Sequence, residues 1–138
     1  KMSKSDASDA SRINLTDTKE EISNKIKKAK TDPYPLPETT QELSRRPEAL
    51  NLMNIYSSLS NQSIDQTLSQ FCGQGFSFFK PKLIDLAIDT LNPISFEMRK
   101  LLNDRKEIDM ILRNGANNAK KIAEPVLKQV KELVGFVT

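Results

Sequence analysis

Two lysines, Lys1 and Lys4, lie three positions apart among small and hydroxyl-bearing residues in the opening segment KMSKS. Each ammonium is a compact charge with rotatable hydrogen-bond donors, and Ser3 and Ser5 add hydroxyl groups and unhindered backbone N–H donors. Such a segment can wrap a polyphosphate and stabilise the negative charge that develops on a departing pyrophosphate. The alternative interpretation is an ordinary polar chain terminus.

Composition narrows the chemistry available to the chain. It has 138 residues, a formal net charge of +3, no histidine and one cysteine, Cys72. These counts fit one domain and exclude an internal disulfide, histidine general-base catalysis and a zinc site built from cysteine and histidine within this sequence. No apolar run approaches the ~18 residues of a membrane span. We expect a cytoplasmic protein that does not enter a membrane, and, because the sequence begins at Lys1, a segment of a longer one.

The elements that position this segment begin with a loop and a helix. Residues 1–16 are expected to form a mobile loop and a short extended stretch. Thr18 and Glu21 have the spacing of a capping box, which predicts a helix start. Four lysines lie in or near the last turn of this helix: Lys25, Lys27, Lys28 and Lys30. They either form a solvated face that complements the helix dipole or form a patch that faces a phosphate.

Proline and glycine divide the middle of the chain. Residues 31–46 contain three prolines and predict an extended surface linker. Pro47 suits the first position of a helix, and Ser63 with Gln66 is a second capping box. Gly73 is placed to end that helix in the left-handed conformation. Residues 75–81 then predict a turn whose aromatic cluster anchors the core, an interpretation favoured over base stacking.

The last third of the sequence predicts three further helices. A long one starts at Lys82 and is expected to kink at Pro93. One helix opens at Asp104 and closes at Asn114–Gly115, and another runs from about 117 to 134. Asp85 and Asp89 lie one turn apart, where solvation is favoured over catalysis. The fold class is therefore all-α: a bundle of five or six helices over residues 17–138, preceded by the loop.

Several ordered segments resemble the C-terminal part of bacterial-type tryptophanyl-tRNA synthetases, over essentially the whole length. KMSKS occurs in many class I aminoacyl-tRNA synthetases, whereas the set that follows is more specific and separates this family from tyrosyl-tRNA synthetases. The segments are KMSKSD (1–6), INLTD (13–17), KIKKAKTD (25–32), NLMNIYSSLSNQSI (51–64), GQGFSFFK (73–80), IDTLNPI (88–94) and NGANNAKKIA (114–123).

The resemblance implies a function and its site residues. Family members use ATP with Mg²⁺ to activate L-tryptophan and then transfer it to tRNA(Trp). They are homodimers, and a Rossmann-type domain preceding KMSKS carries the tryptophan pocket and most of the dimer interface. The ATP-binding residues fall on Lys1, Met2, Ser3, Lys4 and Ser5, with Lys4 and Lys1 acting catalytically, and no metal ligand is implied here.

The resemblance also implies that the helical domain behind the loop reads the tRNA anticodon. Individual contacts do not follow from the sequence, and four lysines on the outer side of the last helix are candidates only by position: Lys120, Lys121, Lys128 and Lys131. The isolated chain is expected to be inactive. A second hypothesis is a free-standing helical RNA-binding or scaffold module without catalysis, and a Rossmann-type half with an ATP motif would distinguish the two.

Overall fold

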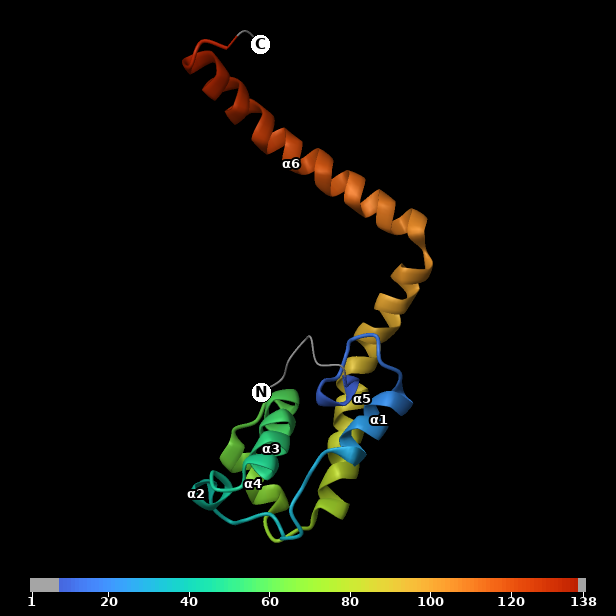
Figure 1. Ribbon diagram of the computed structural model, residues 1–138, viewed down its shortest axis with the longest axis vertical. Helices are drawn as coiled ribbons and strands as arrows, with labels where there is room; N and C mark the ends of the chain where they lie inside the picture. Colours follow the sequence, from blue (N-terminus) through green and yellow to red (C-terminus); the bar gives the residue numbers. More distant parts are fainter. Residues whose placement is uncertain (1–7, 137–138) are drawn as a thin grey trace. The chain divides into compact units, whose positions relative to one another are not determined.

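The computed structural model describes residues 8–136, and this part of the chain contains helices and no strands (Figure 1). A short 3₁₀ helix, η1 (Asp9–Ser11), precedes six α-helices. The all-helical prediction is confirmed. The α-helices are α1 (Lys19–Lys28), α2 (Thr40–Leu43), α3 (Pro47–Ser60), α4 (Ile64–Phe71), α5 (Phe76–Asn103) and α6 (Arg105–Leu133).

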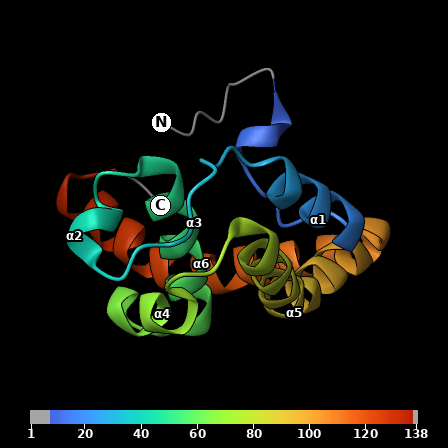
Figure 2. The same ribbon diagram turned by 90° about the horizontal axis from the view of Figure 1, so that it is seen from below.

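The chain divides into two compact units between Met98 and Arg99, a point that lies inside α5. Unit 1 holds η1, α1 to α4 and most of α5, and unit 2 holds the end of α5 and α6. Figures 1 and 2 show that α1 lies beside the first half of α5, while α3 and α4 lie together. The predicted boundary between residues 16 and 17 remains a prediction.

Both predicted capping boxes are present. Thr18 Oγ1 accepts from the backbone N–H of Glu21 and the Glu21 carboxylate accepts from the N–H of Thr18, at 3.2 and 2.7 Å. Ser63 and Gln66 repeat the arrangement at the start of α4. Each box satisfies two N–H groups that a helix start leaves without partners.

The proline-rich stretch is extended except for one short helix that the sequence did not predict, α2. Arg46 fixes the stretch: its guanidinium pairs with Asp32 and donates to the carbonyls of Tyr34 and Pro35. Leu36 then exchanges backbone hydrogen bonds with residues 73 and 74, which brings the linker against the end of α4. Pro47 occupies the first turn of α3, as predicted.

Gly73 adopts a φ of 74° directly after α4, which confirms its predicted role at the helix end. The prediction of a turn over residues 75–81 is wrong, because α5 already begins at Phe76 and continues through Pro81. The spacing of Phe76 and Phe79 explains the early start: a helix places residues three apart on one face, and here both rings are buried. Their burial offsets the one backbone hydrogen bond that Pro81 removes.

The core of unit 1 is apolar and draws on α1 to α5, with Leu36 from the linker. Aromatic rings form its centre, with Phe71 packing edge-on against Tyr56 and Phe79 at centroid distances of 4.9 and 5.0 Å. The predicted role of this cluster as a core anchor is therefore confirmed for Phe76 and Phe79. The buried apolar residues are Ile22, Ile26, Leu36, Leu43, Ala49, Leu52, Met53, Leu68, Phe71, Phe76, Phe79, Leu83, Ile84 and Ala87.

Unit 2 confirms one prediction about the end of the chain and corrects another. Asp104 caps α6 as expected, accepting from the N–H of Glu107 at 3.1 Å. The predicted break at Asn114–Gly115 is wrong, because α6 runs without interruption through Gly115 and also through Pro125. A glycine costs a helix only ~1 kcal/mol relative to alanine, which good helix-forming neighbours outweigh. No helix in the described part of the chain is long and apolar enough to span a membrane.

Candidate functional site

The five residues predicted to bind ATP phosphates, Lys1 to Ser5, lie outside the described residues, and their role remains a prediction. The structure does describe the segment that follows them. We call residues 8–17 the stem, because it joins the KMSKS motif to α1.

The stem contains more local structure than the expected loop. Ser8 caps η1 by accepting from the N–H of Ala10 at 3.3 Å. Asn14 and Asp17 close a turn, in which Asp17 N–H donates to the Asn14 carbonyl at 3.0 Å and the Asp17 carboxylate accepts from Asn14 N–H at 2.8 Å. These bonds give the stem a defined path into α1 at Thr18.

Lys25 of α1 joins the two halves of the stem. Its Nζ lies 2.8 Å from Asp9 Oδ2 and 2.6 Å from Asp17 Oδ2. Asp9 also accepts from Asn14 Nδ2 at 2.7 Å and pairs with Arg12 at 2.8 Å. The polar contacts of the stem thus converge on two carboxylates that share one ammonium group.

Charge and burial strengthen this arrangement. The side chains of Lys25 and Asp17 are only 14% and 7% exposed, whereas that of Asp9 is 50% exposed. Burial alone would lower the pKa of Lys25, but hydrogen bonds to Asp17 and Asp9 outweigh it and raise the pKa above its ordinary value. The Lys25 hydrogen bond, followed by that of Asn14, lowers the pKa of Asp9. Lys25 and Asp9 are therefore charged at neutral pH.

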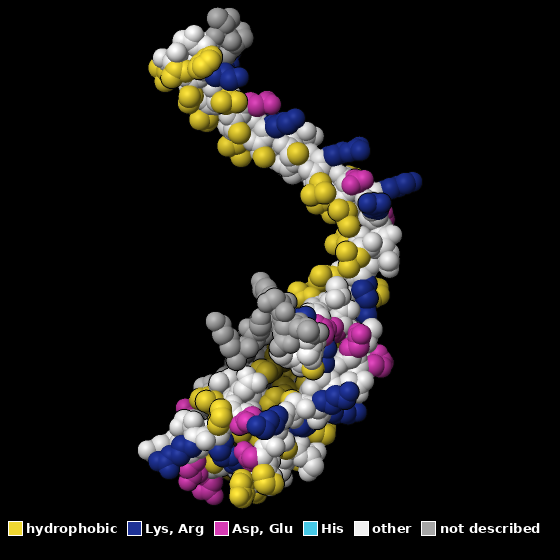
Figure 3. Space-filling view, in the orientation of Figure 1, with side chains coloured by type: hydrophobic (Ala, Val, Ile, Leu, Met, Phe, Trp, Pro, Cys, Tyr) yellow, Lys and Arg dark blue, Asp and Glu magenta, His cyan; other side chains and the backbone are white. Residues whose placement is uncertain are grey.

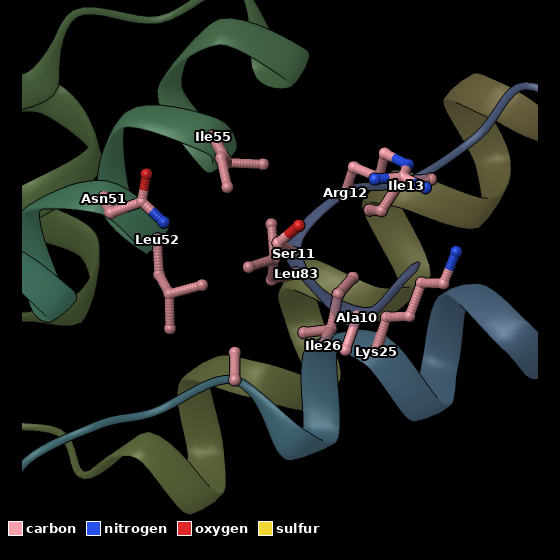
Figure 4. Close-up of a pocket in the computed structure, with 11 residues that line it drawn as sticks. Ala10, Ser11, Arg12, Ile13, Lys25, Ile26, Asn51, Leu52, Ile55 and Leu83 are labelled. Atoms are coloured by element: carbon pink, nitrogen blue, oxygen red, sulfur yellow. The ribbon is translucent and has the colours of Figure 1, made fainter. Parts of the chain in front are cut away.

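A cavity of about 440 Å³ lies between the stem and helices α1, α3 and α5 (Figure 4). Its wall is mainly apolar, and its two cationic residues, Arg12 and Lys25, are paired with the stem carboxylates. The cavity therefore has few groups that could bind a phosphate. Its apolar residues form a surface against which the stem packs. The lining residues are Ala10, Ser11, Arg12, Ile13, Lys25, Ile26, Ala29, Asn51, Leu52, Ile55 and Leu83.

The lysines at the end of α1 do not share one environment. Lys25 points to the stem, Lys30 pairs with Glu48 at 3.2 Å, and Lys27 and Lys28 are exposed. The choice between a solvated face and a phosphate-facing patch therefore concerns Lys27 and Lys28 above all.

The carboxylates Asp85 and Asp89 are exposed on α5, which agrees with the favoured role in solvation. Among residues 8–136, no group of three or more His, Cys, Asp or Glu side chains is arranged to hold a metal ion.

The four candidate tRNA contacts all project from α6 and are exposed. At 3.6 residues per turn they fall within an arc of about 100° on one side of the helix, and Figure 3 shows dark blue side chains along one side of α6 and yellow ones along another. Lys128 lies 3.9 Å from Glu132, an exposed pair of little strength. The candidates are Lys120, Lys121, Lys128 and Lys131.

Sequence reasoning missed the link between Lys25 and Asp9. The sequence predicts Lys25 in the basic last turn of α1 and Asp9 in a mobile loop. Sixteen positions separate the two residues, so no local spacing rule connects them. The indirect signal was that Lys25, Asn14 and Asp17 all fall within segments that carry the family resemblance.

Comparisons with known proteins agree with the motifs. Residues 1–82 match the family described as tRNA synthetases class I (W and Y). The chain is 52% identical to the tryptophan–tRNA ligase of Caulobacter vibrioides over 136 residues, which are 99% of this chain and 40% of the relative. It is 51% identical to that of Rhizobium meliloti, over 99% of this chain and 39% of the relative, and 46% identical to that of Rickettsia conorii, over 99% and 41%.

The chain thus spans about 40% of the length of the curated relatives it matches. The resemblance to tryptophanyl-tRNA synthetases is confirmed along nearly all of the chain, and the family match begins at the KMSKS motif. The chain belongs to the class I tRNA synthetases of the W and Y family.

Proposed function

We propose that this chain is the C-terminal part of a protein that activates L-tryptophan with ATP and transfers it to tRNA(Trp). The observation that carries the proposal is the similarity to tryptophan–tRNA ligases over 99% of the chain, the KMSKS motif included. In the activation step, the tryptophan carboxylate forms a bond to the α-phosphorus of ATP, and the bond from that phosphorus to the pyrophosphate oxygen breaks.

In this proposal Lys4 and Lys1 contact the ATP phosphates and stabilise the charge on the leaving pyrophosphate. Met2, Ser3 and Ser5 complete the segment and contribute backbone and hydroxyl donors. Mg²⁺ would be held by phosphate oxygens and water, a usual arrangement for this ion in nucleotide sites. In the sequence, the stem connects this segment to the helical part of the protein.

The helical part is proposed to contact the tRNA, including its anticodon. The four lysines of α6 support an electrostatic contact, because their charges lie on one side of an exposed helix. The whole protein is proposed to act as a cytoplasmic homodimer, associated through a Rossmann-type domain outside this segment.

The test is tryptophan-dependent exchange of label between pyrophosphate and ATP, measured for the longer protein and for the 138-residue chain alone. We expect exchange with tryptophan but not tyrosine in the longer protein, and only background in the chain alone. Absence of tryptophan-dependent exchange in the longer protein would overturn the proposal. Turnover by the chain alone would show that the amino-acid pocket lies within these residues.

A further inference from the structure

The side chain of Lys25 makes polar contacts from α1 to both ends of the stem. Asp17 immediately precedes the N-cap of α1, and its pairing with Lys25 joins the start of that helix to its last turn. Asp9 lies eight positions earlier, on η1. The contact from Lys25 to Asp9 at 2.8 Å therefore ties the far end of the stem to the helix.

The Lys25 ammonium lies between two carboxylates that are close to each other. Asp9 and Asp17 both accept from the Asn14 side chain, at 2.7 and 3.4 Å, so the two carboxylates lie close together. Like charges at such a separation repel unless a cation is shared between them. Removing the Lys25 charge would leave the nearly buried Asp17 without its cation and Asp9 with Arg12 alone, and the repulsion between the two carboxylates would increase.

We propose that Lys25 is a positioning residue for the KMSKS segment: by holding Asp9 and Asp17 together, it fixes the course of the stem, which follows that segment in the sequence. The proposal rests on the proposed function. In this proposal Lys25 touches no substrate and acts through Asp9. Asp9 lies near the N-terminal end of the stem, five positions after Lys4 in the sequence. A displacement of about 1 Å in a catalytic group can cost ~10²-fold in rate, so a loosened stem should be visible in the chemical step.

The experiment uses the full-length protein that contains this chain, with pre-steady-state adenylate formation measured at saturating tryptophan and varied ATP. Lys25→Met keeps the length and apolar stem of the side chain but removes its charge. We expect a maximal rate about 10–100-fold below that of the parent, with the KM for tryptophan unchanged. Lys25→Arg retains the charge and should recover much of the rate. Lys82→Met, an exposed lysine on α5, is the matched control and should match the parent.

A second variant separates positioning from folding. Asp9→Asn removes the tie to η1 but leaves the buried pair of Lys25 and Asp17 intact. It should slow adenylate formation in the same direction as Lys25→Met, with little change in thermal unfolding because Asp9 is half exposed. A parental rate in Asp9→Asn would overturn the proposal, even if Lys25→Met fails to fold.

A double-mutant cycle with Lys4→Ala distinguishes positioning from a purely structural role. It compares the effect of Lys25→Met on the rate of adenylate formation in the presence and in the absence of the Lys4 side chain. If Lys25 acts through the KMSKS segment, Lys25→Met should have little further effect once Lys4 is absent. Equal slowing in both backgrounds, or a raised KM for tryptophan, would mean general loosening and would overturn the proposal. If Lys4→Ala alone leaves the rate unchanged, the proposed function itself fails; if Lys4→Ala is slow and Lys25→Met is parental, only the positioning role fails.

Discussion

Lys80 and Ala29 are joined by a hydrogen bond that spans 51 positions of sequence: the Lys80 ammonium donates to the Ala29 carbonyl at 2.7 Å. The same ammonium donates to the Lys27 carbonyl at 2.9 Å. The last carbonyls of a helix have no partner within it, and a cation there also complements the helix dipole. One side chain of α5 thus caps α1 and holds the two helices together.

Lys80→Met should destabilise the 138-residue chain by about 1–3 kcal/mol, since the partly buried contact to the Ala29 carbonyl and the exposed contact to the Lys27 carbonyl both lose a charged donor. Burial lowers the pKa of Lys80, because desolvation disfavours the charged form of the side chain. The measurement is the free energy of unfolding from urea denaturation. Lys82→Met, two positions along and exposed, should change it by less than about 0.5 kcal/mol. Equal effects of the two substitutions would contradict the capping role.

Acid should weaken the link between the proline-rich stretch and α3. The Arg46 hydrogen bond lowers the pKa of Asp32 below its ordinary value of 3.8. A depressed carboxyl pKa contributes stability that is complete above the unfolded value and is lost as the pH falls through the folded value. Between about pH 6 and about pH 3, the parent should therefore lose stability more steeply than Asp32→Asn. Parallel stability curves for the two proteins would show that this pair contributes no pH dependence.

The continuity of α6 through Gly115 can be tested with the substitution Gly115→Ala, which adds one methyl group. Gly115 has a helical conformation and no atom within 4 Å of an added Cβ. Gly115→Ala should stabilise the helix by about 1 kcal/mol and increase the amide-exchange protection of residues 111–119. Gly73→Ala is the contrasting control, because its φ of +74° disfavours any side chain, and it should destabilise the chain. Lower protection in Gly115→Ala would mean that the helix ends near Asn114.

Binding of tRNA to the longer protein should depend on salt through α6. Each lysine that contacts a phosphate contributes to the slope of log affinity against log salt, so Lys120→Gln with Lys121→Gln should reduce that slope by about 1–2. Lys82→Gln is the control for a lost charge elsewhere. An unchanged slope in the double variant would remove these two lysines from the interface.

The parts of the fold that the sequence could predict are those fixed by local chemistry. The starts of α1, α4 and α6 follow from Thr18, Ser63 and Asp104, because a cap needs only residues three positions apart. Gly73 is similar, since its role depends on its own φ. These features require no knowledge of the rest of the chain.

The errors had different causes, and packing outweighed a local signal in the first of them. Pro81 indicated a turn, but the burial of Phe76 and Phe79 favoured a helix that includes it. Asn114–Gly115 has the composition of a helix end, yet α6 continues. The contact of Lys25 with Asp9 had no local signal, because it forms only after the stem has folded back onto α1. The ATP-contacting role of residues 1–5 came from resemblance alone and remains a prediction.

The most direct test of the account is adenylate formation by Lys4→Ala in the full-length protein, followed in the pre-steady state with tryptophan saturating. We predict a rate about 10²–10³-fold below the parent, the usual cost of losing one preorganised charge partner of a transition state, with little change in tryptophan affinity or thermal stability. Lys1→Ala should act in the same direction but less strongly, and Lys4→Arg should not restore the full rate, because a planar guanidinium does not replace a point charge. Adenylate formation at the parental rate in Lys4→Ala would contradict the account and leave residues 1–5 as an ordinary polar segment.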